Sequence, residues 1–491
     1  MIQKGKITDF PVSKYIETNT ICALATPHAT GALALVRMSG PQALEIAGKV
    51  FRTAACADLR QSEGYRTYFG RVSDSEGELL DEVLLSVFRA PHSFTGEDSV
   101  EISCHGSLYI QDTLLRTLVE NGAVMAGPGE FSQRAFLNGK MDLAQAEAVA
   151  DLIASENRTS HKMSMNQMRG VFSQELSALR SRLLELASLM ELELDFAGED
   201  VEFADKHELR SLVDSLLLRI GNLCDSFRMG NAMKKGIPVA IAGLVNAGKS
   251  TLLNALLGEE KALVTPVAGT TRDTIEDVLV LDGIPFRFID TAGLRHIGDV
   301  NELSQEHIEK LGVKRSMETI RSAAVLMLVI DASRPETYSE SLQSVAEFNN
   351  EHILYIINKI DLVYNKDVTL EEFMNTLCNR SVTFNKPNTY VLPVSAANNV
   401  GIEDVKKILG AMIRPELDRN TVMLTNLRHY QELRSAGEAL EHVREGLDAG
   451  LSGDLLTPDL RQALHHVGSI TGEITPDDIL GEIFGRFCIG K

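Results

Sequence analysis

GLVNAGKS (243–250) follows the apolar run IPVAIA (237–242) and leads into TLLNALLG (251–258), a segment rich in helix-forming residues. It matches the phosphate-loop pattern GxxxxGK[ST] in the strand, turn and helix context that this pattern requires. Its glycines let backbone N–H groups approach phosphates, and the helix N-terminus adds a positive dipole end. We expect Lys249 to reach the β- and γ-phosphate oxygens and Ser250 to bind Mg²⁺.

Strand-like runs recur after this loop and are separated by helical segments. They are VLVL (278–281), FRFID (286–290), AVLMLVID (324–331), ILYIIN (353–358) and YVLPVS (390–395). Strands that alternate with helices indicate a parallel sheet. Residues 236–410 are therefore predicted to form an α/β Ras-like P-loop domain.

Three further motifs stand in the order that a guanine-nucleotide-binding protein requires. In DTAG (290–293), Asp290 can hold the Mg²⁺ shell through water and the Gly293 N–H can sense the γ-phosphate. In NKID (358–361), the Asp361 carboxylate can accept both N–H groups of a guanine edge, a donor pair that adenine lacks. SAA (395–397) supplies the loop beside the guanine O6. The expected GTP-binding residues are Asn246, Ala247, Gly248, Lys249, Ser250, Thr251, Asp290, Thr291, Ala292, Gly293, Asn358, Lys359, Asp361, Ser395, Ala396 and Ala397.

The segment GTTRD (269–273) lies between the phosphate loop and DTAG. One of its threonines, for which we favour Thr271, is expected to complete the Mg²⁺ coordination; a polar turn is the alternative. Hydrolysis needs a group that orients water, which in Ras-type proteins is a Gln just after DTAG. Leu294 occupies that position here. The sequence thus predicts a catalytic residue from elsewhere, or a slow switch that depends on a partner.

The flanking sequence predicts two other kinds of domain. Residues 20–125 alternate apolar runs with Gly and Pro breaks and two helical stretches, which indicates an α+β domain. From Asp142 to about Phe227, and again after Pro415, apolar residues follow helical spacing. We expect one helical domain in two halves with the α/β domain inserted, two separate bundles being the alternative. The predicted boundaries are 1–140, 141–235, 236–410 and 411–491.

Composition limits the classes of protein that this chain can belong to. Its 491 residues predict two to four domains, and 44% hydrophobic and 24% charged residues are typical of a soluble globular protein. A net charge of −20 argues against a large basic surface for nucleic acid. The six cysteines form no CxxC pair, and no run of eighteen apolar residues occurs. We therefore expect reduced thiols and a cytoplasmic protein without a membrane segment.

Four segments of the flanking sequence are distinctive: ATPHATGALALVRMSG (25–40), SFTGEDSVEISCHG (93–106), PGEFSQRAFLNGKMDLAQAEAVADLI (128–153) and FCIGK (487–491). With them the chain resembles one family, the tRNA-modification GTPases known as MnmE or TrmE. The resemblance implies a homodimer with an N-terminal domain that dimerises and binds folate, a helical domain and the inserted G domain. It also implies an FAD-containing MnmG or GidA-type partner in a heterooligomer. Together they would add an aminomethyl-type group, such as carboxymethylaminomethyl, to C5 of the wobble uridine (position 34) of certain tRNAs.

The resemblance assigns roles to individual residues. The one-carbon unit would come from methylenetetrahydrofolate, and Arg37, Glu101, Lys140 and Lys491 would bind this or the 5-formyl derivative. Cys488 matches the family's functional cysteine, although a small side chain packed under the C-terminal tail is an equal alternative.

The same resemblance implies a GTPase that is stimulated by K⁺ and activated by G-domain dimerisation. The K⁺ ligands would be Asn246, Thr265, Val267 and Thr270, with Thr265 and Thr270 also close to GTP. Glu309 in HIEKLG (307–312) matches the water-orienting acid, but a longer loop before it leaves Glu306 and Glu302 as alternatives. Val245 departs from the Pro of many members, which should change loop stiffness more than chemistry. A ribosome-assembly or RNA-binding GTPase switch is the alternative function, although such proteins usually add a basic module that is not visible here.

Overall fold

The computed structural model divides the chain into two compact units. One unit comprises Met1–Ala154, Ser164–Val213 and Glu438–Lys491, and the other comprises Ser155–Met163 and Asp214–Gly437. The structure describes residues 19–155, 157–195, 206–258, 277–290, 317–318, 320–321, 323–343, 348, 350, 352–363, 389–419, 423–474, 477–485 and 487–490.

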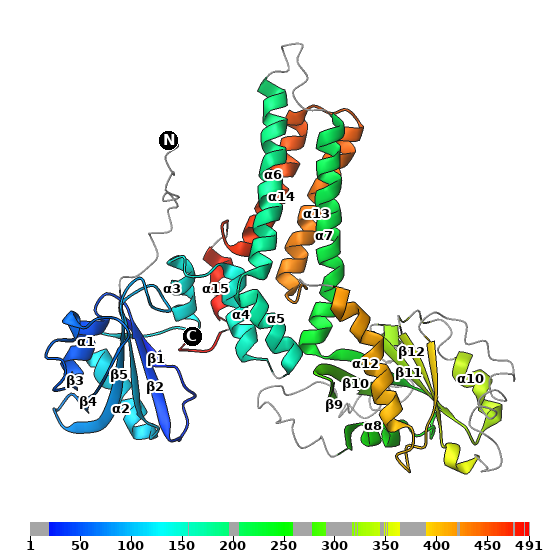
Figure 1. Ribbon diagram of the computed structural model, residues 1–491, viewed down its shortest axis with the longest axis horizontal. Helices are drawn as coiled ribbons and strands as arrows, with labels where there is room; N and C mark the ends of the chain where they lie inside the picture. Colours follow the sequence, from blue (N-terminus) through cyan, green and yellow to red (C-terminus); the bar gives the residue numbers. More distant parts are fainter. Residues whose placement is uncertain are drawn as a thin grey trace, which may run out of the picture. The chain divides into compact units, whose positions relative to one another are not determined.

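A seven-stranded sheet near the N-terminus organises the first unit (Figure 1). All neighbouring strands are antiparallel except β1 and β7, which are parallel. Helices α1 (Ala43–Val50) and α2 (Leu108–Glu120) cover one face and bury Leu44, Ile46, Leu114 and Leu118 with the alternate residues of the strands. The strand order is β3 (Phe51–Arg52), β4 (Arg66–Ser73), β5 (Leu79–Phe88), β6 (Ser99–His105), β2 (Leu33–Ser39), β1 (Ile21–Leu24) and β7 (Val124–Met125).

The other face of β1 is covered by α3 (Glu130–Leu137), whose Phe131 packs on Ile21 and Ala23. Helix α4 (Leu143–Ile153) begins with a capping box between Asp142 and Gln145. The C-terminal helix α15 (Asp477–Gly485) packs against α3 and α4 through an apolar cluster that includes Phe484. The C-terminal helix is thus packed against helices that follow the first sheet in the sequence.

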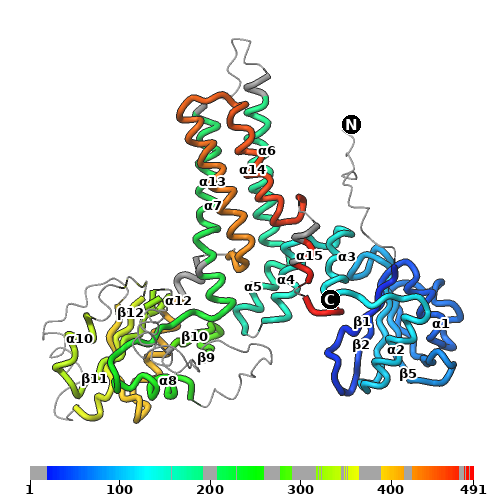
Figure 2. The backbone as a smooth tube through the Cα atoms, turned by 180° about the vertical axis from the view of Figure 1, so that it is seen from behind, coloured from blue at the N-terminus to red at the C-terminus, as the bar shows by residue number. Residues whose placement is uncertain are grey.

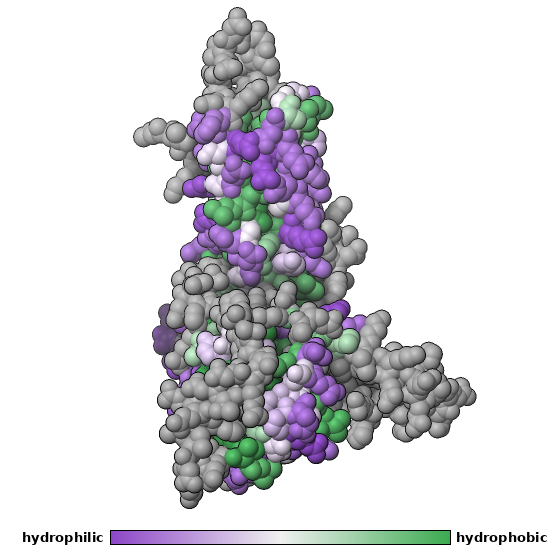
Figure 3. Space-filling model, turned by 90° about the vertical axis from the view of Figure 1, so that its right-hand side faces the viewer, coloured by the Kyte–Doolittle hydropathy of each residue, from purple (hydrophilic) through white to green (hydrophobic). Residues whose placement is uncertain are grey.

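The helical stretches on either side of the second sheet pack against each other. Helix α6 (Val171–Asp195) lies beside α14 (Gly453–Thr471), as Figures 1 and 2 show. Helix α7 (Lys206–Lys235) contacts α13 (Leu427–Asp448), where the rings of Phe227 and Tyr430 stack 4.6 Å apart. On the face shown in Figure 3, hydrophilic side chains cover most of the described surface of these long helices. Helix α5 (Arg158–Met168) completes the first helical stretch.

A six-stranded sheet forms the core of the second unit. Its strands are parallel except β9, which is antiparallel to β10 at one edge. Helices α8 (Lys249–Leu257) and α12 (Ile402–Arg419) bury Leu252, Leu256 and Leu409 against it, and α10 (Tyr338–Gln343) packs on β11. The strand order is β13 (Thr389–Pro393), β12 (His352–Asn358), β11 (Val325–Asp331), β8 (Ile237–Ala242), β10 (Ile284–Asp290) and β9 (Asp277–Leu281).

The expected fold class is confirmed: an α+β N-terminal domain, helices and an inserted α/β domain. The expectation that the first helical stretch ends near Phe227 is wrong, because α7 continues to Lys235. Its last turns pack Met233 into the core of the second sheet, which stabilises helix beyond the point where the apolar pattern weakens. In the part of the chain that the structure describes, no helix is long and apolar enough to cross a membrane.

Candidate functional site

The phosphate loop connects the central strand β8 to α8 with three positive-φ residues. Gly243 has φ 144°, Asn246 has φ 66° and Gly248 has φ 94°. A Cβ atom at Gly243 would meet the Val329 carbonyl oxygen, and one at Gly248 would meet the Asn358 amide. Only glycine fits both the backbone conformation and the space at these two positions. The backbone of Val329 on the neighbouring strand and the side chain of Asn358 therefore account for the glycines at 243 and 248 of GLVNAGKS.

Lys249 is the first residue of α8, and its ammonium lies across the loop that precedes it. Its Nζ donates to the carbonyl oxygens of Gly243 and Leu244 at 2.8 and 2.9 Å. Ser250 follows in the first helical turn, at the end of the helix where N–H groups have no partner within the helix. A cation, a hydroxyl oxygen and free N–H groups at one helix end suit a phosphate with Mg²⁺.

Asn358, at the end of β12, joins the phosphate loop to the SAA loop. Its Nδ2 donates to the Ala247 carbonyl oxygen at 3.0 Å, and its Oδ1 accepts from the Ala396 N–H at 3.1 Å. Ser395 donates its hydroxyl to Asp361 at 2.5 Å. The structure thus brings the phosphate loop together with two motifs that follow it more than a hundred residues later in the sequence.

Asp331 is a site residue that the sequence analysis missed. It is 6% exposed at the end of β11, beside the strand that carries Asn358, and it accepts a hydrogen bond from Lys359 Nζ at 2.7 Å. Ser333 donates its N–H and hydroxyl to the other carboxylate oxygen. Burial opposes ionisation, but these hydrogen bonds outweigh it and lower the pKa of Asp331 below its ordinary value. The rule that carboxyl ends of parallel strands form the site was the available signal.

Several expected residues fall outside the described part of the chain. Asp290 ends β10, whose backbone pairs with Ile241 of β8, so its position in the chain is at the phosphate-loop edge of the sheet. Of the expected K⁺ ligands only Asn246 is described, and it stands at a loop position next to Lys249. The residues that lie outside are Thr265, Val267, Thr270, Thr271, Thr291, Ala292, Gly293, Glu302, Glu306, Glu309 and Lys491.

A second cluster lies on the first sheet and contains the residues expected to bind folate. Arg37 on β2 and Glu101 on β6 are cross-strand neighbours, and both Nε and Nη2 of Arg37 contact the Glu101 carboxylate at 2.8 Å. The guanidinium also lies over the rings of Phe94 and Phe131, 5.4 and 5.8 Å from their centroids. This charged pair is about a quarter exposed and is bordered by aromatic rings, which suits a planar polar ligand.

Lys140 reaches the same region from the end of α3. Its exposed ammonium donates to the Pro91 carbonyl oxygen at 2.8 Å, and its methylene groups pack beside Gly96. Pro91, Phe94 and Gly96 belong to one connection between β5 and β6. Arg37 and Lys140 therefore touch the same loop, although 103 residues separate them in the sequence.

The C-terminal segment runs along the edge of this sheet. Ile489 forms a bridge with Pro128, and the Cys488 carbonyl oxygen accepts from the Gly129 N–H at 3.4 Å. Gly490 lies against the Leu24 carbonyl oxygen on β1, which pairs with the Arg37 strand. Cys488 is exposed and has a free thiol. The segment next to Lys491 is thus one strand away from Arg37.

Comparison with known proteins gives matches over nearly the whole chain. Residues 143–488 match the MnmE helical domain, and residues 20–140 match the GTP-binding protein TrmE N-terminus. The tRNA modification GTPase MnmE of Christiangramia forsetii is 48% identical over 96% of this chain and 99% of that protein. The proteins of the same name from Bacteroides thetaiotaomicron and Flavobacterium johnsoniae are each 46% identical, over 96% and 97% of this chain and 99% and 100% of theirs. Because these matches cover nearly the whole chain, including the helical stretches and the nucleotide-type site, this chain belongs to the MnmE family of tRNA modification GTPases.

Proposed function

We propose that this protein hydrolyses GTP as part of a tRNA modification reaction. The observation that carries the proposal is the position of Asn358, whose side chain joins Ala247 of the phosphate loop to Ala396 of the SAA loop. These contacts hold the expected phosphate site and the expected guanine site at one edge of one sheet. Family membership supplies the tRNA setting.

Different residues at this edge of the sheet would contact the phosphates, the guanine base and Mg²⁺. Lys249 leaves the Gly243 and Leu244 carbonyl oxygens to contact the β- and γ-phosphates, and the α8 N–H groups hold the same oxygens. Asp361 accepts the two N–H groups of guanine while Ser395 fixes its carboxylate. Ser250, Thr271 and the outer-shell Asp290 would hold Mg²⁺, which neutralises charge on the phosphates.

We further propose that hydrolysis depends on K⁺ and on pairing of two G domains. Asn246, with Thr265, Val267 and Thr270, would hold the cation, which takes the role that an arginine finger has in other GTPases. Glu309 would orient the attacking water, since Leu294 has no group that can do so. The Asn246 side chain offers the hard oxygen that such a cation prefers.

For the second cluster we propose a reduced folate. Arg37, Glu101 and Lys140 bring two cations and a carboxylate to one loop, a set that matches the carboxylates and the N–H groups of a tetrahydrofolate. Lys491 would add a cation from the C-terminal segment. Such a folate would supply a one-carbon unit for C5 of the wobble uridine. In this reaction a homodimer of this chain would act together with an FAD-containing MnmG or GidA-type partner.

For Cys488 we propose two alternative roles, one in chemistry and one in packing. Its exposed thiol, on a segment that reaches β1, is open to reaction with a carbon or sulfur electrophile near the folate site. The alternative is a packing role for the tail. The cytoplasmic location stays a prediction from the sequence.

Nucleoside mass spectrometry of tRNA tests the proposal as a whole. Cells that lack this protein would be rescued with the unchanged gene or with Lys249→Ala. We expect loss of the C5-modified wobble uridine and its return only with the unchanged gene. Unchanged wobble nucleosides in the deleted strain would reject the tRNA role and favour a ribosome-assembly GTPase instead.

A further inference from the structure

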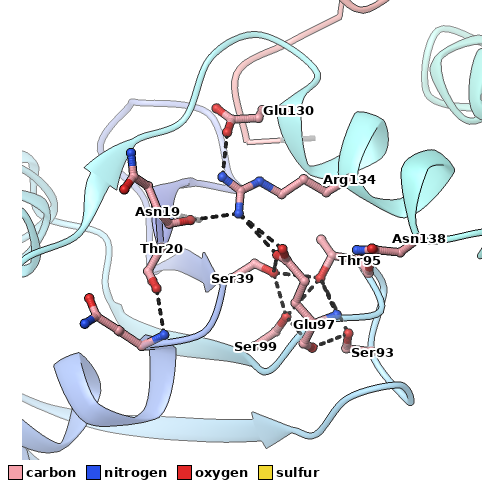
Figure 4. A network of polar contacts seen from close by, with 11 residues as sticks. Asn19, Thr20, Ser39, Ser93, Thr95, Glu97, Ser99, Glu130, Arg134 and Asn138 are labelled. Atoms are coloured by element: carbon pink, nitrogen blue, oxygen red, sulfur yellow. Dashed lines mark hydrogen bonds and ion pairs between the residues drawn. The ribbon is translucent and has the colours of Figure 1, made fainter. Parts of the chain in front are cut away.

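The loop Ser93–Asp98, which connects β5 to β6, is held by a buried polar network (Figure 4). Glu97 accepts a hydrogen bond from the Ser39 hydroxyl at 2.7 Å, and Ser39 also contacts Thr95 at 2.6 Å. Ser93 donates its hydroxyl to the Glu97 carbonyl oxygen at 2.6 Å. The loop is therefore fixed to strand β2 by side chains that are shielded from water.

Arg134 of α3 provides the positive charge that pairs with the Glu97 carboxylate of this network. It is 5% exposed, and its Nη1 lies 3.3 and 3.4 Å from the two Glu97 carboxylate oxygens. The same nitrogen donates to the Asn19 carbonyl oxygen at 2.9 Å, while Nη2 donates to Glu130 at 2.8 Å. A buried guanidinium is tolerated only when its donors are satisfied, so these contacts fix its position closely.

This loop carries the contacts to the second cluster. Phe94 lies over the Arg37 guanidinium, and Gly96 packs beside the Lys140 stem. The Thr95 carbonyl oxygen accepts from Asn138 at 2.7 Å, which ties the loop to the turn before Lys140.

We propose that Glu97 and Arg134 are positioning residues for the reduced-folate site. Their ion pair holds the loop Ser93–Asp98 between β2 and α3, and so keeps Phe94 against Arg37 and Gly96 against Lys140. Without the pair the loop loses its fixed position, and the ligand must order it on binding. This inference rests on the proposed folate role for its ligand, but the position of the loop is testable without any ligand.

The chain contains no tryptophan, so Phe94→Trp places a single fluorescent reporter in the loop. In that background we would compare Arg134→Met, Arg134→Lys and Glu97→Gln with Arg66→Met, which breaks an exposed ion pair in the same domain. Acrylamide quenching would be measured well below the thermal midpoint seen by circular dichroism. We expect the quenching constant to rise by about twofold or more in the first three variants, because disrupting a buried pair leaves a buried charge without its partner, whereas an exposed pair contributes little. Arg66→Met should leave it unchanged.

Binding of 5-formyltetrahydrofolate to the full-length chain, with Phe94 intact, supplies the second readout. We expect Glu97→Gln and Arg134→Lys to raise Kd roughly tenfold or more, and Arg66→Met to leave it unchanged. A lower thermal midpoint with unchanged quenching and unchanged Kd would overturn the proposal and leave the pair a purely structural role. If the unsubstituted protein does not bind the folate, the folate role fails, and the quenching data still decide whether the pair positions the loop.

Discussion

The Lys359 ammonium lies 2.7 Å from the Asp331 carboxylate, and the same nitrogen donates to the Asn246 carbonyl oxygen at 2.7 Å. Lys359 has φ 64°, a conformation that costs energy for a residue with a side chain. Asp331 therefore holds a strained residue of the guanine-site motif against the phosphate loop. The Lys359 ammonium thus joins the chain segments at the carboxyl ends of β8, β11 and β12.

Asp331→Asn tests this link. The amide cannot form the ion pair, and losing a hydrogen bond to a charged group costs roughly 1.5–3 kcal/mol, with the lower end expected because Lys359 is 30% exposed. We expect the Kd for GDP to rise about tenfold, measured by titration with a fluorescent GDP analogue. Asp404→Asn, an exposed acid on α12, is the matched control and should bind like the unchanged protein.

The same variant predicts a pH dependence. The pKa of Asp331 is lowered in the folded protein, so its stabilising effect is fully present above the ordinary aspartate pKa of about 3.9 and is lost as the pH falls through the folded value. The difference in unfolding free energy between the unchanged protein and Asp331→Asn should be constant from about pH 5 to 8 and shrink in acid. A difference that instead grew on acidification would contradict the sign.

Lys249→Ala should abolish nucleotide binding while the fold is kept. The side chain donates to two carbonyl oxygens of its own loop, so we expect the fold to be kept, whereas the cation that would face the phosphates is lost. Isothermal titration with GTP and GDP measures the loss, and circular dichroism checks the fold. Tight binding of either nucleotide by a folded variant would reject the phosphate-loop assignment.

Replacing KCl by NaCl should slow GTP turnover by about tenfold or more, because the smaller Na⁺ would fit the proposed set of oxygen ligands less well and so stabilise the transition-state charge less. Phosphate release at equal ionic strength measures it. Asn246→Ala should remove the difference between the two salts. Equal rates of the unchanged protein in both salts would count against a cation site at Asn246.

Glu309→Ala should slow hydrolysis by about a hundredfold, because water is no longer oriented for attack, and leave GTP affinity unchanged. Single-turnover hydrolysis and nucleotide titration separate the two effects. Glu306→Ala and Glu302→Ala are the matched controls in the same segment. Full activity of Glu309→Ala with loss in one of these two would move the assignment to that residue.

The described cysteines should differ in their reaction with iodoacetamide. Burial raises the pKa of Cys22 to about 11, and burial with the nearby Asp81 charge raises that of Cys104 to about 11. At pH 8 only about a thousandth of each is thiolate, and both are buried, whereas Cys488 is exposed. Peptide mass spectrometry should find Cys488 alkylated first. Early modification of Cys22 would show that the core between the first sheet and helices α1 and α2 opens in solution.

Short contiguous motifs and apolar runs could be recognised from the sequence alone. GLVNAGKS, NKID and the strand runs predicted the α/β domain, because a phosphate loop needs its glycines and lysine at fixed spacing and buried parallel strands need continuous apolar runs. The segments around Arg37, Glu101 and Cys488 pointed to the family for the same reason: each is a contiguous pattern.

Tertiary structure alone decided which distant residues meet. Asp331 stands in no motif, and the segment 128–153 that contains Arg134 gives that residue no role. Each is informative only because a strand end or a helix face brings it to a partner, Lys359 in one case and Glu97 in the other. Packing of Met233 on the second sheet likewise accounts for helix in α7 beyond Phe227, where the apolar pattern ends. Local spacing encodes backbone geometry and short motifs, whereas a buried ion pair depends on the path of the whole chain and has no period or spacing that a sequence could display.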